Sequence, residues 1–186
     1  MLKSYKSGYI LTKNWKEDLM NIWIFAIGLY NRLIEEINNA SKEERKIGPK
    51  DTQALIVKFK EENPELKKVY SKVLQMVNYQ LWSNIWSLSQ LKKKGRKVGK
   101  LRYKKNGRYK SMNFNQSGFS IYAKSNRIFL SKIGSIKAKI HTRINGKVKG
   151  VWIKRYLSGK WYAIIHVEKD KDILPETGKE IGIDLA

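Results

Sequence analysis

The sequence contains no cysteine, which excludes disulfide frameworks, cysteine-ligated zinc fingers and thiol nucleophiles. It also contains no long uncharged apolar run. The longest, Ile22 to Tyr30, falls well short of the roughly 20 residues that a membrane span needs, and the N-terminus has no signal-peptide core. We therefore expect a soluble, cytoplasmic protein without a membrane partner.

Acidic residues are missing from more than half of the chain. Residues 1–65 contain 11 Lys or Arg and 10 Asp or Glu, whereas residues 66–167 contain 25 Lys or Arg and no acid. The net charge is +23 and the pI is near 10.1. Charges of both signs normally mingle along a chain, and such self-repulsion usually persists only when the partner is a polyanion. The pattern predicts nucleic-acid binding.

Hydrophobic residues make up 41% of the 186 residues and include six Trp, so we expect a folded protein with the charged residues on its surface. Apolar residues at 3/4 spacing predict a long amphipathic helix over 14–39. A second helix is expected over 51–62 with Asp51 as its cap, and a third from Asn63-Pro64 to Lys94-Gly95. The first half therefore reads as a three-helix unit.

Strand signals begin near Ser111, after a glycine-punctuated connection. They include a pair within 121–130, an alternating strand over 136–140, and a hairpin of 147–155 with 160–168. Several short antiparallel strands predict a small β-barrel, so the expected fold class is α+β.

Trp152 and Trp161 are expected to face each other across the hairpin and to serve packing rather than base stacking. His141 and His166 are far apart in the sequence, with no second ligand near either, and we interpret both as ordinary strand residues.

The densest basic stretch runs from Lys92 to Lys110 and includes aromatic residues. Lys and Arg can neutralise phosphates and release counterions, while tyrosine can stack on bases. A disordered linker that only aids solubility is the alternative interpretation. The residues expected to contact nucleic acid are Lys92, Lys93, Lys94, Arg96, Lys97, Lys100, Arg102, Tyr103, Lys104, Lys105, Arg108, Lys110, Lys149, Lys154 and Arg155.

Asp184 lies in the C-terminal segment Gly182-Ile183-Asp184-Leu185, an apolar strand with one carboxylate. Ribonuclease-H-like nucleases hold a catalytic divalent metal with an aspartate in such a strand. We name Asp184 as a candidate catalytic and metal-binding residue whose further ligands are missing.

Seven short stretches follow one another along the chain: Leu11-Thr12-Lys13, Asn63-Pro64-Glu65-Leu66, Leu101-Arg102-Tyr103-Lys104, Lys132-Ile133-Gly134-Ser135-Ile136-Lys137, Gly146-Lys147-Val148-Lys149-Gly150, Ser158-Gly159-Lys160-Trp161-Tyr162 and Gly182-Ile183-Asp184-Leu185. In this order and spacing they resemble the N-terminal half of the TnpB/OrfB family, transposon-encoded RNA-guided nucleases related to type V CRISPR effectors.

The resemblance implies a wedge-type antiparallel β-barrel from residues 1–12 and 98–175, a helical recognition lobe inserted over 13–97, and the first strand of an incomplete RuvC-like nuclease domain over 176–186. In the family these parts hold guide RNA and target DNA. The implied partners are therefore RNA and DNA, with a nucleoid-associated location and no small-molecule substrate.

The sequence departs from the family pattern at two places. Leu101 and Tyr103 replace the family's usual proline and phenylalanine, and the chain ends two residues after Asp184, without the later carboxylates and the zinc ribbon. We expect a truncated member that binds nucleic acid, is not an enzyme as it stands and needs no cofactor, since Mg²⁺ belongs only to a completed site. The alternatives are an active nuclease completed by a second polypeptide and a generic basic RNA-binding module.

Overall fold

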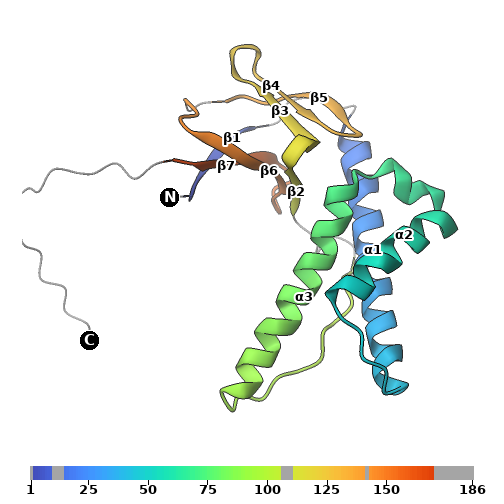
Figure 1. Cartoon of the computed structure of the whole chain (residues 1–186). Coiled ribbons are helices and arrows are strands. Elements are labelled where there is room, and N and C mark those ends of the chain that lie inside the picture. Colours follow the sequence, from blue (N-terminus) through green and yellow to red (C-terminus); the bar gives the residue numbers. More distant parts are fainter. Residues whose placement is uncertain (1, 10–14, 106–110, 141–142, 170–186) are drawn as a thin grey trace, which may run out of the picture.

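The computed structural model describes residues 2–9, 15–105, 111–140 and 143–169. Three α-helices within these ranges follow a first strand (Figure 1). They are α1 (Trp15–Lys42), α2 (Pro49–Glu62) and α3 (Ser71–Lys93), with a short 3-10 helix, η1 (Pro64–Lys68), before α3. The unit is held together by α3, which packs against both α1 and α2.

In the described part of the chain, seven strands form two antiparallel sheets. The strands are β1 (Leu2–Tyr9), β2 (Ser111–Asn115), β3 (Phe119–Tyr122), β4 (Arg127–Leu130), β5 (Gly134–Lys137), β6 (Lys147–Arg155) and β7 (Trp161–Glu168). The larger sheet has the order β1-β7-β6-β2 and the smaller one the order β3-β4-β5. Because β1 pairs with β7, the three helices lie between two strands of one sheet in the sequence.

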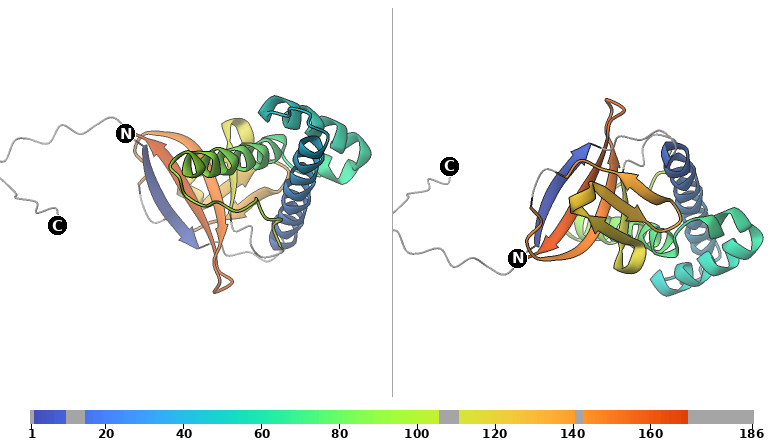
Figure 2. Two further views of the ribbon diagram at one scale, coloured as in Figure 1. Left: turned by 90° about the horizontal axis from the view of Figure 1, so that it is seen from below. Right: turned by 90° about the horizontal axis from the view of Figure 1, so that it is seen from above.

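The α+β class with antiparallel strands is confirmed, but the described residues do not form the expected closed barrel. The larger sheet ends at β1 and β2, and a barrel requires that such edges pair. The chain between β2 and β6 instead forms the separate sheet β3-β4-β5. This smaller sheet lies over one face of the larger one, and the helices extend to one side (Figures 1 and 2).

A tryptophan at the start of β7 joins the helical unit to the larger sheet. The ring of Trp161, which is 4% exposed, lies 5.5 Å from that of Trp15 in an edge-on arrangement and 4.6 Å from that of Trp23 on α1. Apolar side chains of α1 and both sheets continue this contact, among them Leu19, Phe114, Ile128, Ile136, Val151 and Ile165. One hydrophobic core therefore spans helices and sheets.

Tyr70, just before α3, forms a second joint. Its ring stacks on Phe114 of β2 at a centroid distance of 6.3 Å, and its hydroxyl donates to the carbonyl of Asn115 at 3.3 Å. The same ring lies against Gly118, where an added Cβ would be 2.3 Å from it. Glycine at this position lets the tyrosine pack flat, which fixes the start of α3 against the end of β2.

The start of the third helix differs from the prediction. Asn63 does act as a cap, since its side-chain oxygen accepts from the Glu65 amide at 3.1 Å, but Pro64–Lys68 form the 3-10 helix η1. The backbone becomes extended at Val69 before α3 begins at Ser71. This break allows the intervening Tyr70 to reach β2.

The second helix also starts earlier than predicted. It begins at Pro49, and Asp51 stands in its first turn instead of at the cap. The carboxylate of Asp51 accepts a hydrogen bond from the Gly48 amide at 2.7 Å. Asp51 therefore still satisfies a free amide at the helix start, from inside the helix.

Trp152 and Trp161 do not face each other across the hairpin, so that prediction is wrong. The β6–β7 register pairs Trp152 with Ile164 and Trp161 with Arg155. Since side chains alternate between the faces of a strand, Trp161 lies on the buried face, and Trp152 lies on the other face, 5.8 Å from the ring of His166. Both tryptophans pack within the protein.

We predict that Trp161→Ala lowers the free energy of unfolding by about 3–5 kcal/mol, because it leaves a cavity between α1 and the sheet. Trp152→Ala, on the half-buried outer face, should cost less than half as much. Urea unfolding followed by circular dichroism measures both, and equal losses would contradict the role of Trp161 as the joint.

Candidate nucleic-acid interface

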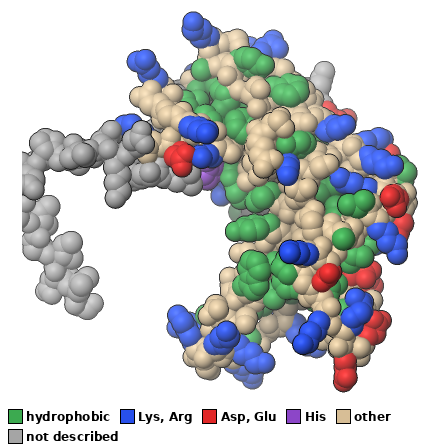
Figure 3. Space-filling model, viewed as in Figure 1, with side chains coloured by type: hydrophobic (Ala, Val, Ile, Leu, Met, Phe, Trp, Pro, Cys, Tyr) green, Lys and Arg blue, Asp and Glu red, His purple; other side chains and the backbone are tan. Residues whose placement is uncertain are grey.

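Acidic and basic side chains are segregated on the folded protein. The described carboxylates lie on or beside α1, α2 and η1, apart from Glu168 at the end of β7. Several are already paired with cations there, as in Arg32 with Glu62 and Arg45 with Glu43. Figure 3 shows acidic side chains gathered over the α1 and α2 side and almost none over α3 and the sheets. A polyanion would therefore meet a favourable potential at α3 and the sheets.

The end of α3 carries a group of exposed cations that we call the basic tip. Its residues are Lys92, Lys93, Lys94, Arg96 and Lys97. The helix ends at Lys93, and Gly95 two residues later has a φ of +73° that suits glycine. The amides of Gly95 and Arg96 donate to the carbonyls of Lys92 and Leu91 at 3.0 and 3.1 Å. Cations here also complement the negative end of the helix dipole. The tip thus has a stable backbone on which five cations remain open to solvent.

After the basic tip the chain returns along the helices toward the sheets, and we call residues 98–105 the return segment. The side chain of Asn31 on α1 clamps this segment: its Oδ1 accepts from the Lys104 amide at 2.7 Å, and its Nδ2 donates to the Lys104 carbonyl at 2.9 Å. Lys100, Arg102 and Lys105 are exposed, and Tyr103 is 55% exposed. The clamp presents these side chains from fixed backbone.

Lys104 differs from its neighbours because its ammonium points inward. Its Nζ lies 4.0 Å from the centre of the Tyr30 ring and 3.5 Å from Oε1 of Gln80. Burial lowers the pKa of Lys104 from 10.5 to about 8, although the ring face favours the charged form. Lys104 was predicted to contact phosphate, but the structure places it within the packing of α1 against the return segment.

The folded state binds the Lys104 proton less tightly than the unfolded state does. Between about pH 8 and pH 10.5 the unfolded chain therefore holds more protons, and the contribution of Lys104 to the free energy of unfolding rises with pH. We predict that Lys104→Met removes this rise and stabilises the protein at pH 7 by about 1 kcal/mol, after allowance for solvent screening. Lys105→Met, which removes an exposed charge next to it, should keep the rise. Thermal unfolding from pH 7 to 10.5 makes the comparison, and parallel curves for the two variants would contradict it.

The three basic residues predicted on the hairpin have contacts of their own. Lys149 pairs with Glu168 at 2.7 Å, and this hydrogen bond lowers the pKa of the glutamate. Lys154 lies over the ring of Tyr156 at 5.0 Å. Arg155 contacts the sulfur of Met20 on α1 at 3.4 Å.

The described residues of this set lie in two parts of the fold: the end of α3 with the return segment, and the strand β6. The basic tip lies at the end of α3 away from the sheets, and the return segment runs back from it beside the helices (Figure 1). Lys149, Lys154 and Arg155 lie on β6. Arg108, Lys110 and Asp184 lie outside the described residues, as does the predicted nuclease strand 176–186.

Sequence reasoning missed a strip of side chains along α3. Lys72, Tyr79, Trp86 and Lys93 recur every seven residues and so share one face of the helix, with a cation at each end and a ring at each middle position. Tyr79 is 62% exposed and Trp86 is 50% exposed. The heptad spacing of the two lysines and two aromatic residues is the sequence signal for this strip. It occurs in the same helix as the apolar spacing of the buried face (Val73, Val77, Leu81).

A buried polar network fixes α2 beside this strip. The Trp82 indole donates to the Thr52 hydroxyl at 2.8 Å, and that hydroxyl donates to Oδ1 of Asn78 at 2.8 Å. Asn78 in turn donates to the Pro49 carbonyl at 3.1 Å and to Oε1 of Gln53 at 3.4 Å. Because Thr52 is fully buried and Asn78 nearly so, these bonds determine how α2 sits on α3.

We predict that Thr52→Val lowers the free energy of unfolding by about 3 kcal/mol, because it leaves the Trp82 N–H and the Asn78 carbonyl buried without this partner. Thr52→Ser keeps the hydroxyl and should cost about 1 kcal/mol for the lost methyl group. Chemical denaturation distinguishes the two, and a Val variant no less stable than the Ser variant would contradict the network.

Two further observations bear on function. Among the described residues, no three His, Asp or Glu side chains lie close enough to hold a metal ion. The helices within the described ranges are too short or too polar to cross a membrane.

Comparison with protein-family models and with curated proteins gives no match for this chain.

Proposed function

We propose that this chain is the nucleic-acid-binding part of a TnpB-like RNA-guided nuclease and that it binds RNA and DNA without cutting them alone. The observation that carries the proposal is the basic surface of α3 and the sheets, where Glu168 is the one described carboxylate, and the five exposed cations of the basic tip at the end of α3. Phosphate groups are the natural counter-charge for such a surface.

The arrangement of the chain supports the same proposal. Three helices stand between two strands of one antiparallel sheet, as a recognition lobe inserted in a wedge-type domain would. In this proposal residues 1–12 and 98–175 form the wedge-type domain, residues 13–97 form the lobe, and Asp184 begins the nuclease domain. The protein would act near the nucleoid, and Mg²⁺ would be needed only where a second polypeptide completes the nuclease.

We predict that alanine at Lys92, Lys93 and Lys94 weakens binding to a labelled RNA hairpin and reduces the slope of log K against log[salt] by about 2–3, because each lost phosphate contact releases about one counterion fewer. The matched control replaces Lys16, Lys46 and Lys58 by alanine. These lysines are exposed among carboxylates on the α1 and α2 side, and their replacement removes the same amount of charge. Fluorescence anisotropy from 50 to 300 mM salt measures both.

An equal loss in the two triple variants would mean that net charge alone determines binding. The kind of RNA bound then separates the TnpB-like function from its alternative. One structured RNA species recovered with the purified protein supports it, whereas a random mixture supports a generic basic RNA-binding module.

A further inference from the structure

Tyr79 and Trp86 on α3 expose their rings to water, which costs free energy. Leaving large aromatic surface in water forgoes roughly 25 cal/mol for each Å² that could have been buried. The strip formed by Lys72, Tyr79, Trp86 and Lys93 exposes two such rings, which helical spacing places about two turns apart on one face. Exposed aromatic residues grouped in this way mark an interaction site.

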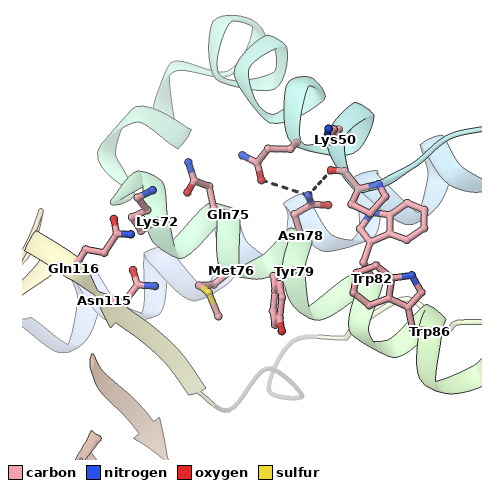
Figure 4. A pocket seen from close by; sticks show the side chains of 12 residues that line it. Lys50, Lys72, Gln75, Met76, Asn78, Tyr79, Trp82, Trp86, Asn115 and Gln116 are labelled. Carbon is pink, nitrogen blue, oxygen red and sulfur yellow. Dashed lines mark hydrogen bonds between the residues drawn. The ribbon is translucent and has the colours of Figure 1, made fainter. Parts of the chain in front are cut away.

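A hollow of about 470 Å³ lies beside the strip, between α3, the start of α2 and the end of β2. Figure 4 shows the rings of Trp82 and Trp86 next to each other, with Tyr79 projecting from α3 nearer to Met76. Polar and basic side chains complete the lining, namely Lys50, Gln53, Lys72, Gln75, Asn78, Asn115 and Gln116. The hollow therefore combines flat apolar surface with hydrogen-bonding groups and two cations.

Contacts within the protein hold the wall of the hollow in place. Trp82 is 9% exposed, donates to Thr52 and lies 6.3 Å from the ring of Trp86. Tyr70 fixes the start of α3 against β2, which supplies Asn115 to the lining. A ligand that stacks on Trp86 thus meets a ring supported from behind, and little ordering is needed on binding.

The charge around the hollow favours an anionic partner. Lys50 and Lys72 contribute positive charge, and α3 has no carboxylate. Asp51 follows Lys50 directly in the sequence, and its carboxylate accepts the hydrogen bond from the Gly48 amide. An apolar peptide would satisfy the rings but not the cations, whereas an unpaired nucleotide satisfies both.

We propose that the bases of a single-stranded nucleic acid stack on Tyr79 and Trp86, while its phosphates contact Lys50, Lys72 and Lys93. This proposal rests on the nucleic-acid binding proposed above and adds to it the form of strand that is bound. Every base has a π-face, so stacking accepts any sequence, and a duplex cannot use the site because its base faces are covered.

The test compares three fluorescent 12-mers with the full chain: oligo(dT), an abasic strand with the same phosphates, and a duplex. Oligo(dT) should bind at least about tenfold more tightly than the abasic strand, because only bases can stack. Oligo(dT) should quench part of the tryptophan emission, and this quenching should be smaller in Trp86→Ala, since the chain has five other tryptophans. Oligo(rU) should behave like oligo(dT).

Tyr79→Ala and Trp86→Ala should each reduce this preference for bases, because each removes a ring on which a base stacks. Both side chains are at least half exposed, so the variants should fold, which circular dichroism checks. The matched control is Tyr122→Ala, since Tyr122 is 53% exposed but lies on β3, away from α3. It should retain the full preference.

The outcomes separate the two proposals. Equal binding of oligo(dT) and the abasic strand overturns base stacking but leaves nucleic-acid binding intact. Binding of neither strand, and of no duplex or RNA hairpin, overturns both. The α3 strip is not the binding site if the preference for bases survives Tyr79→Ala and Trp86→Ala. The same holds if Tyr122→Ala abolishes the preference equally.

Discussion

Repulsion among the cations of residues 66–167 constrains how this chain can fold. With a net charge of +23 and no acid in that stretch, most of these cations have no carboxylate near them in sequence, although Lys68 at the start of the stretch pairs with Glu65. The structure keeps most of them exposed, at the end of α3, along the return segment and on outer strand positions. Lys104 is drawn inward, and burial there lowers its pKa to about 8. A lysine at this position therefore opposes folding at neutral pH.

Apolar contacts hold the helical unit and the larger sheet together. Trp161 packs between Trp15 and Trp23 at one joint, and Tyr70 packs on Phe114 at the other. Such contacts are not weakened by moderate salt, whereas attraction between exposed lysines and phosphates falls steeply. Salt that weakens contacts between exposed lysines and phosphates would therefore leave the geometry of this surface unchanged. This separation makes salt dependence a useful measure of binding as distinct from unfolding.

Much of the fold could be predicted, because local periodicity decides it. The long apolar repeat of α1 and the β6–β7 hairpin were both found from spacing. The strand pair within 121–130 was found as well, since β3 and β4 pair in the structure, but local spacing did not show that these strands and β5 form a sheet of their own instead of part of a barrel. The inward turn of Lys104 depends on Asn31, which is 73 residues away, and no sequence pattern distinguishes it from Lys105. The aromatic strip could have been found from its heptad spacing.

The α3 strip and the basic tip together determine what a bound strand could look like. Lys72 and Lys93 are 21 residues apart, which is roughly 31 Å along the helix axis at 1.5 Å per residue. A strand with bases stacked about 3.4 Å apart covers that distance with about nine nucleotides. Tyr79 and Trp86 are about 10 Å apart, so their stacked bases would be separated by about two others. Contacts with phosphates fix register without reading sequence, and stacking accepts any base. The helix is therefore suited to holding a single strand in place, and recognition of a particular sequence would have to come from base pairing with a guide or from other residues.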